Sequence, residues 1–170
     1  VKIFFVPSYL NGDDGVFNMP YYDLLVGMDL TAFPSYYEPW GYTPLESLAF
    51  KVPTITTTLA GFGLWVKEHY NMNHPGIEVI HREDGDASNV ATAIAEWVKN
   101  YTQVGETEMQ KDRDNAKDVS RIALWDNLIN YYKQAYTIAL NQVSERLKDL
   151  PANMNESVSY IEKQLTVNNP

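Results

Sequence analysis

One stretch of the chain, Phe33–Glu46, most constrains the fold that the chain can adopt. The apolar run Leu30–Phe33 leads into it and is typical of a short buried strand. At its other end, Thr43 and Glu46 have the spacing of a capping box at the start of a helix that includes Leu45–Phe50. The stretch therefore predicts a strand, a polar loop and a helix N-terminus, in that order. In a parallel α/β sheet such a loop lies at the carboxyl ends of the strands, where ligands bind.

Strand-like runs and helical patterns alternate along the first hundred residues. The predicted strands cover Val1–Val6, Asp29–Phe33, Thr54–Thr58 and Ile77–Ile80. The predicted helices cover Tyr21–Met28, Thr43–Phe50, Leu64–Tyr70 and Ala87–Asn100. Alternation of this kind predicts an α/β fold, with a parallel sheet that has helices on both faces.

The second half of the chain is expected to be helical. Glu106–Ala123 is a charged helical segment, and Trp125–Leu150 repeats apolar residues at helical spacing until Pro151 interrupts it. These helices exceed what a four-stranded sheet needs for cover. We therefore expect three parts: a sheet domain over residues 1–123, a crossing helix over 124–150 and a polar tail over 151–170.

Composition excludes several classes of protein. The net charge of −9 argues against a sequence-independent nucleic-acid binder, because nucleic-acid phosphates would be repelled. The chain has no cysteine, so it can form neither a disulfide framework nor a thiolate metal site. No apolar run approaches the roughly 18 residues of a membrane span, and no signal peptide opens the chain, so we expect a cytoplasmic protein with no membrane partner. The chain begins inside a strand-like run, so we also expect it to be a fragment.

Metal-ligating residues are not clustered in the sequence. The acidic pair Asp13 and Asp14 has no nearby histidine and is better explained as part of a solvated loop. The three histidines, at positions 69, 74 and 81, fit no metal spacing. We therefore expect neither a metal nor another cofactor.

The residues of the central loop carry a resemblance to a known family. The run Phe33–Pro44 reads Phe-Pro-Ser-Tyr-Tyr-Glu-Pro-Trp-Gly-Tyr-Thr-Pro, and Glu38 is separated from Glu46 by seven residues. This pattern resembles the signature of retaining glycosyltransferases of the GT-B fold, and the full run resembles glycogen synthases of the animal and fungal type. The resemblance continues, in order and spacing, through Gly61–Gly63, Glu68-His69, Trp125 and Tyr131-Tyr132.

The resemblance implies a fold and an activity. Such enzymes have two Rossmann-like domains with the active site between them, and this sequence resembles the latter part of the C-terminal, nucleotide-sugar-binding domain. The implied reaction transfers glucose from UDP-glucose to the non-reducing end of an α-1,4-glucan such as glycogen, with retention at the anomeric carbon. UDP-glucose rather than ADP-glucose is the donor that this family type favours. The N-terminal domain would be a necessary partner, and homo-oligomerisation stays open.

The resemblance also implies roles for individual residues. Glu38 is expected beside the donor sugar as the catalytic carboxylate, either as a nucleophile or through electrostatic stabilisation. Glu46 is expected to bind the donor ribose, with a structural capping-box role as the alternative. The remaining donor-binding candidates are Tyr21 for stacking on uracil, Trp40 for shaping the pocket, Gly41, Tyr42 and Thr43 for the diphosphate at the helix start, and Gly61, Phe62 and Gly63 near the donor sugar.

Two departures from the family pattern limit the expected activity. The family's cationic pair that neutralises the donor diphosphate lies upstream of the matched region, so we expect the chain alone to be inactive. The family's arginine-rich helix for the activator glucose 6-phosphate is matched here by Glu106–Asp118, which has three cations among five acids. We therefore expect no activation by this sugar phosphate. The alternatives are a non-catalytic module that binds nucleotide sugar or glucan, and another retaining GT-B glucosyltransferase.

Overall fold

The computed structural model describes residues 2–70, 74–148, 159 and 163. The chain divides into two compact units, Val1–Leu124 and Trp125–Pro170. The first unit holds the sheet and the predicted functional loop, and the second consists of helices in its described part.

The sheet of the first unit has three parallel strands in the order β1-β2-β3 among the described residues. The strands are β1 (Thr31–Ala32), β2 (Thr54–Thr57) and β3 (Ile77–Ile80). All four residues of β2 are buried, as expected for the central strand of a parallel sheet with both faces covered. The predicted α/β fold with a parallel sheet is confirmed.

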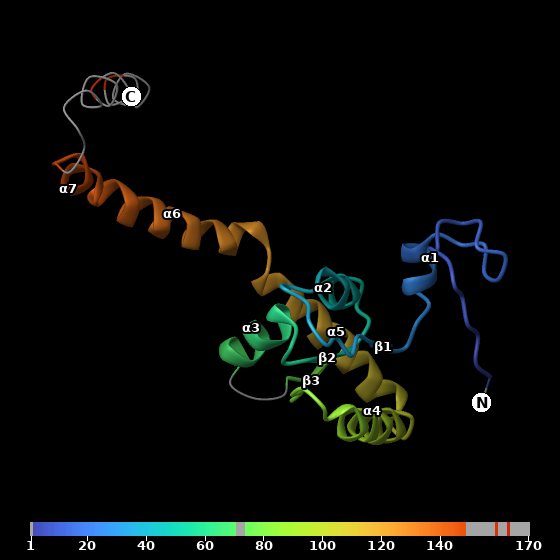
Figure 1. The fold of residues 1–170 in the computed structure, drawn as a ribbon. Coiled ribbons are helices and arrows are strands. Elements are labelled where there is room, and N and C mark those ends of the chain that lie inside the picture. The colour runs from blue at the N-terminus through green and yellow to red at the C-terminus, as the bar shows by residue number, and fades with distance from the viewer. Residues whose placement is uncertain (1, 71–73, 149–158, 160–162, 164–170) are drawn as a thin grey trace. The chain divides into compact units, whose positions relative to one another are not determined.

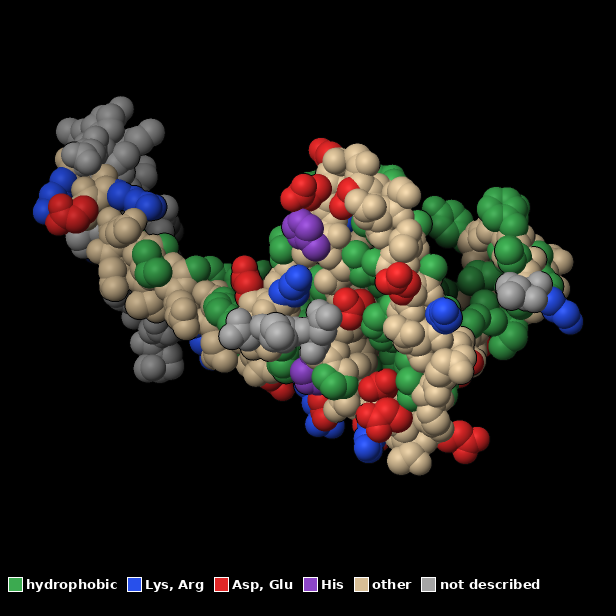
Figure 2. Space-filling model, turned by 90° about the horizontal axis from the view of Figure 1, so that it is seen from below, with side chains coloured by type: hydrophobic (Ala, Val, Ile, Leu, Met, Phe, Trp, Pro, Cys, Tyr) green, Lys and Arg blue, Asp and Glu red, His purple; other side chains and the backbone are tan. Residues whose placement is uncertain are grey.

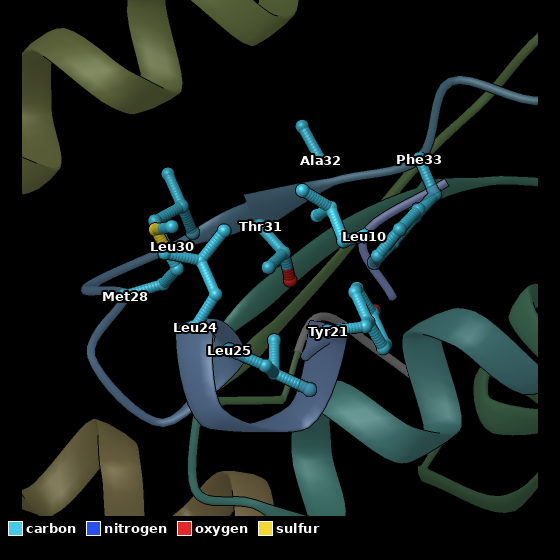
Figure 3. A pocket seen from close by; sticks show the side chains of 9 residues that line it. All are labelled: Leu10, Tyr21, Leu24, Leu25, Met28, Leu30, Thr31, Ala32 and Phe33. Carbon is cyan, nitrogen blue, oxygen red and sulfur yellow. The ribbon is translucent and has the colours of Figure 1, made fainter. Parts of the chain in front are cut away.

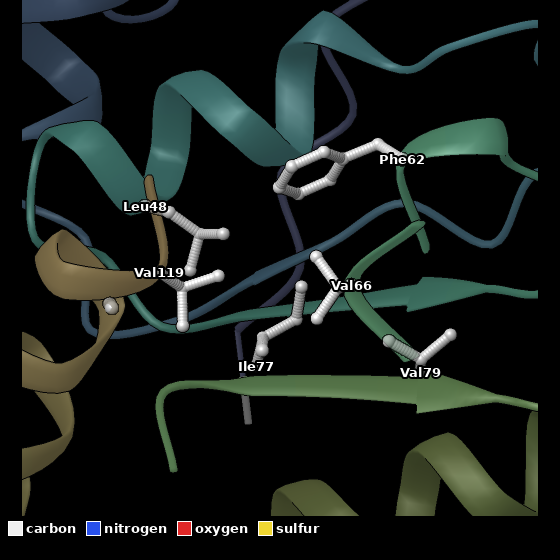
Figure 4. Close-up of a cluster of buried hydrophobic side chains, with 7 residues drawn as sticks. Leu48, Phe62, Val66, Ile77, Val79 and Val119 are labelled. Carbon is white, nitrogen blue, oxygen red and sulfur yellow. The ribbon is translucent and has the colours of Figure 1, made fainter. Parts of the chain in front are cut away.

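Helices cover both faces of this sheet (Figure 1). Helices α2 (Tyr42–Ala49), α3 (Gly61–Tyr70) and α5 (Glu106–Ile122) pack on one face. Their shared core, drawn in Figure 4, consists of Leu48, Phe62, Val66, Ile77, Val79, Ala116 and Val119. Helix α4 (Ala87–Tyr101) packs on the other face through Val90, against Ile55 and Ile80. Alternate residues of β3 thus point into different cores, as the two-residue period of a strand requires.

The predicted strand over Val1–Val6 is wrong. Lys2–Val6 forms neither a strand nor a helix, and the side chains of Ile3 and Phe5 are 89% and 82% exposed. The ring of Phe4 instead lies 6.0 Å from that of Phe17 in the following loop. A strand needs a neighbour for its backbone groups, and among the described residues no strand lies beside this run. Apolar composition alone could not supply that neighbour.

The short helix α1 (Tyr21–Leu25) comes between this N-terminal segment and β1. Strand β1 bonds to β2 through the amides of Thr31 and Phe33, which donate to Pro53 and Ile55. Because successive residues of a strand face opposite edges, the amide of Ala32 faces away from β2. Ala32 is exposed, so β1 forms an open edge of the described sheet.

Helix α3 begins at Gly61, three residues before the predicted start at Leu64. The sequence pattern predicted a break between strand and helix at Gly61 and Gly63. In the structure these glycines allow two backbone segments to approach closely: a Cβ on Gly61 would collide with the carbonyl of Pro39, and one on Gly63 with that of Thr57. The two glycines therefore let the first turn of α3 lie directly against the loop and β2.

The second unit contains α6 (Trp125–Asn141) and α7 (Val143–Lys148), where the sequence predicted one helix over Trp125–Leu150. No residue of α6 is buried, and its rings of Trp125 and Tyr132 lie 5.2 Å apart. The predicted polar tail, 151–170, lies outside the described residues apart from Ser159 and Lys163. Within the described part of the chain, no helix is long and apolar enough to cross a membrane.

Candidate functional site

The backbone of Glu38 is tied on both sides. Its amide donates to the carbonyl of Leu59 at 3.1 Å, and its own carbonyl accepts a 3.0 Å hydrogen bond from the amide of Gly61. Two residues further along, the carbonyl of Trp40 accepts a 2.6 Å bond from Phe62. These bonds join the loop after β1 to the turn between β2 and α3, while the side chain of Glu38 is exposed. The predicted catalytic carboxylate therefore sits on a fixed backbone and is open to solvent.

Side chains from the other two strands hold the first half of the same loop. The Thr57 hydroxyl, at the end of β2, donates to the carbonyl of Ser35 at 2.9 Å. The Arg82 guanidinium, just after β3, donates from Nη1 to the carbonyl of Pro34 at 2.7 Å and lies 3.5 Å from the ring centroid of Tyr36. Arg82 is only 4% exposed. The carboxyl ends of β2 and β3 thus both anchor the loop that follows β1.

Sequence reasoning missed Arg82. Its position held a usable signal, because it follows the last strand by two residues and so reaches the same sheet edge as the Phe33–Glu46 loop. A buried guanidinium is rare unless it has hydrogen-bonding partners, and here it bonds to a backbone carbonyl and stacks on an aromatic ring.

Helix α2 starts earlier than predicted. Its N-cap is Gly41, with a φ of 101°, and no side chain caps the helix. The predicted N-cap, Thr43, is instead the second helical residue. Glycine is favoured at Gly41 because the positive φ strains other residues, and because an added Cβ would lie 3.3 Å from Cγ of Pro44 and 3.4 Å from Cγ of Glu38. The side chain of Glu38 therefore lies against the start of α2.

The first turn of α2 leaves backbone donors without partners. Among the described residues, the amides of Tyr42 and Thr43 have no hydrogen-bond acceptor, and both residues are exposed. These amides and the positive end of the helix dipole make a favourable place for an anion.

Glu46 does not form the predicted capping box. Its Oε1 accepts a 3.0 Å hydrogen bond from the hydroxyl of Tyr22 on α1. The hydrogen bond to Glu46 and the negative charge of that carboxylate raise the pKa of Tyr22. The capping-box interpretation is therefore wrong. Tyr22 is a second residue that sequence reasoning missed, and nothing in its local pattern marks it.

Tyr21 lies in an apolar hollow of about 210 Å³ between α1 and β1 (Figure 3). The other lining residues are Leu10, Leu24, Leu25, Met28, Leu30, Thr31, Ala32 and Phe33. The Tyr21 hydroxyl is buried, and the hydroxyl of Ser47 on α2 is the polar group that faces it. Burial raises the pKa of this hydroxyl, and the nearby charge of Glu46 raises it further. The prediction that Tyr21 stacks on uracil stays a prediction.

The side chains of Trp40 and Phe62 serve packing. Phe62 is fully buried, and its ring meets that of Trp40 at 5.6 Å, edge to face. Trp40 also lies 5.6 Å from Trp65 on α3. These contacts tie the loop to the core shown in Figure 4. The ring of Phe62 therefore lies in the core, and its amide bonds to the loop at the carbonyl of Trp40.

The acidic residues form no metal cluster in the part of the chain that the structure describes. The Asp14 carboxylate instead accepts hydrogen bonds from the amides of Val16, Phe17 and Asn18, chiefly Phe17, and these bonds lower its pKa. Figure 2 shows acidic and basic side chains interspersed over the face that carries α4.

Comparison with known proteins identifies the family. Residues 1–168 match the family model described as Glycogen synthase. The chain belongs to the glycogen synthase family. The predicted resemblance, made from the Phe33–Pro44 run, is thereby confirmed.

Individual glycogen synthases resemble the chain over most of its length. The Caenorhabditis elegans glycogen [starch] synthase is 33% identical over 146 residues, which cover 84% of this chain and 21% of that protein. The Neurospora crassa protein is 32% identical over 143 residues, or 84% of this chain and 20% of that protein. Isoform 1 of Saccharomyces cerevisiae is 28% identical over 165 residues, or 91% and 23%. The chain thus spans about a fifth of the length of these relatives.

In this glycogen synthase family chain, the predicted site residues lie in two places. Glu38, the first turn of α2 and the first turn of α3 meet around one loop, through Gly41 and Gly61. Tyr21 and Glu46 lie where α1 meets α2, with Tyr22 between them. Since Glu46 is on the same helix as the free amides, α2 links the two places.

Proposed function

We propose that this chain is the donor-binding part of a glycogen synthase, which transfers glucose from UDP-glucose to the non-reducing end of an α-1,4-glucan with retention. The observation that carries the proposal is the start of α2. There, the amides of Tyr42 and Thr43, which have no acceptor among the described residues, follow Gly41, against which the side chain of the exposed Glu38 lies, in a chain of this family.

The proposed diphosphate site follows from backbone chemistry. An acidic chain can attract a diphosphate only locally, and the α2 start offers two unpaired amides and a helix dipole. Gly41 adds no side chain between these amides and Glu38. A diphosphate bound to the amides would place the attached sugar near the Glu38 carboxylate.

The proposed role of Glu38 is to stabilise positive charge at the anomeric carbon as the bond to the diphosphate breaks. The backbone bonds of Glu38 fix the base of this side chain, which limits how far the carboxylate must move when that charge develops. In the same proposal Glu46 accepts from the ribose hydroxyls, and Tyr21 stacks on the uracil ring. The N-terminal domain supplies the cationic groups and the glucan site, and the protein acts in the cytoplasm.

The proposal is tested by titrating the chain with UDP while recording two-dimensional amide NMR spectra. We expect saturable shifts for the amides of Gly41, Tyr42 and Thr43, because a bound phosphate would accept from them. Uridine, which lacks the diphosphate, should not produce these shifts. Shifts confined to other segments, or none with UDP at millimolar concentration, would contradict the proposal.

Matched variants sharpen the test. Thr43→Pro removes one amide at the second helical position, where proline is tolerated, and should weaken UDP binding by about 3- to 10-fold, the effect of one hydrogen bond. The control must also place proline in the first turn of a helix, because a proline further inside, such as Thr92→Pro in α4, would break the helix. Thr107→Pro, at the second position of α5, makes the same change in a helix of the same unit and should leave UDP binding unchanged.

A further inference from the structure

Tyr22 contacts one residue of α2, Glu46, and the C-cap residue of that helix, Phe50. Its hydroxyl donates to Oε1 of Glu46 at 3.0 Å. Its ring stacks on that of Phe50, with centroids 5.3 Å apart and planes inclined by 23°. Glu46 and Phe50 are four residues apart in the sequence, so they lie one above the other on the helix. Tyr22 is therefore held at both its ring and its hydroxyl.

The same contacts restrain the carboxylate of Glu46. A free glutamate side chain samples many rotamers, and fixing it on binding a ligand has an entropic cost. Here one carboxylate oxygen is already bonded to Tyr22, which the Phe50 ring keeps in place. Among the described residues, Oε2 of Glu46 has no hydrogen-bond donor. Glu46 thus presents one unengaged acceptor oxygen in a set orientation.

We propose that Tyr22 is the positioning residue that orients the Glu46 carboxylate toward the ribose hydroxyls of a bound uridine nucleotide. The inference rests on the proposed function, because it needs Glu46 to be the ribose acceptor. It adds a determinant of sugar specificity. With Tyr22 in place, the Glu46 carboxylate is already oriented when the two neighbouring ribose hydroxyls bind to it. A nucleotide without these hydroxyls gains no affinity from this orientation.

A purely structural role for Tyr22 makes a different prediction. If Tyr22 only joined α1 to α2, its loss would weaken the binding of every nucleotide alike. If Tyr22 acts through Glu46, its loss weakens only the binding of nucleotides that carry ribose hydroxyls. The ratio of two dissociation constants therefore separates the two roles.

The experiment measures the dissociation constants of UDP and its 2′,3′-dideoxy analogue by calorimetry or NMR. The variants are Tyr22→Phe, which keeps the ring on Phe50, Glu46→Gln and the double variant. We expect Tyr22→Phe to weaken UDP binding by about 3- to 10-fold, the effect of one lost hydrogen bond, and to change binding of the analogue by less than about 2-fold. Tyr9→Phe, at a tyrosine that is 92% exposed, should change neither constant.

The double variant guards against a folding defect. If Tyr22 acts through Glu46, Tyr22→Phe should have little further effect once Glu46→Gln is present, whereas independent damage would add up. Equal loss for both nucleotides, or additive losses in the double variant, overturns the inference while the proposed function stands. If the wild-type chain binds UDP but does not discriminate against the analogue, the ribose role of Glu46 falls, and the inference with it. If UDP does not bind at all, both proposals are overturned.

Discussion

The carbonyl oxygen of Glu38 accepts a 3.0 Å hydrogen bond from the amide of Gly61, where α3 begins. Because the bond joins two backbone atoms, it holds Glu38 without using its carboxylate. It also requires the two segments to lie so close that a side chain at Gly61 would collide with the carbonyl of Pro39. The position of the predicted catalytic residue therefore depends on a glycine 23 residues away.

Gly61→Ala should lower the free energy of unfolding by about 1–3 kcal/mol, because the new methyl group must push the Pro39 carbonyl or α3 aside. Thermal or urea unfolding measures the loss. Gly27→Ala is the matched control: its Cβ would meet only the Leu24 carbonyl, at 3.4 Å, and should have an effect below about 1 kcal/mol. Equal stability of the two variants would show that the loop and α3 do not pack this closely.

Arg82→Lys should destabilise the chain by about 2–3 kcal/mol, because lysine cannot keep both the bond to the Pro34 carbonyl and the stacking on Tyr36. Chemical unfolding measures this change. Arg121→Lys, at an exposed arginine on α5, is the control and should be nearly neutral. Tyr36→Phe, which keeps the ring beneath the guanidinium, should also be nearly neutral. A stable Arg82→Lys variant would rule out the anchoring role.

Glucose 6-phosphate should not bind to α5. Three of the four cations of this helix already form ion pairs: Lys111 with Glu108 at 3.0 Å, Arg113 with Asp29 at 2.9 Å, and Arg121 with Asp118 at 3.0 Å. Arg113 also donates to the Met28 carbonyl, so engaging a phosphate would break contacts within the fold. An NMR titration checks this, with inorganic phosphate as the control. A saturable shift of α5 amides by the sugar phosphate alone would contradict the prediction.

Tyr22 should titrate above its ordinary pKa of 10.0, because Glu46 disfavours the phenolate. A raised folded-state pKa means that this contribution to stability is fully present below pH 10 and is lost as the pH rises through the folded value. NMR titration of the Tyr22 ring checks the shift. In Glu46→Gln, which lacks the charge, the pKa should fall back toward 10. An unchanged pKa in that variant would show that the two groups do not interact in solution.

The chain alone should transfer glucose from UDP-glucose to glycogen at least about 1,000-fold more slowly than a full-length glycogen synthase, because the cationic groups of the proposed partner domain are missing. A radiolabel transfer assay measures the rate, with a full-length relative as the positive control. Turnover within about tenfold of that relative would refute the need for the second domain.

Local sequence patterns correctly predicted the helices and strands whose packing partners come from neighbouring elements of the chain. Ile77–Ile80 is a strand as predicted, because its alternating residues fill two cores that nearby helices complete. Lys2–Val6 has the same kind of composition and is not a strand, because pairing requires a neighbour that composition does not reveal. The same holds at the candidate site: the family motif named Glu38 and Glu46 as candidates, while the contacts of Arg82 and Tyr22 span 48 and 24 positions, so no local pattern predicts them.

The backbone ties of Glu38 have a consequence for altering donor choice. Since atoms common to every residue fix this position, its neighbour Tyr37 is free to vary: its side chain is 82% exposed and takes no part in the hydrogen bonds that hold the loop. Tyr42 is 70% exposed in the same way. Randomising these two positions would change the side chains around the proposed sugar site while the backbone of Glu38 stays in place. They are therefore the first positions to vary when seeking a variant that accepts another sugar nucleotide.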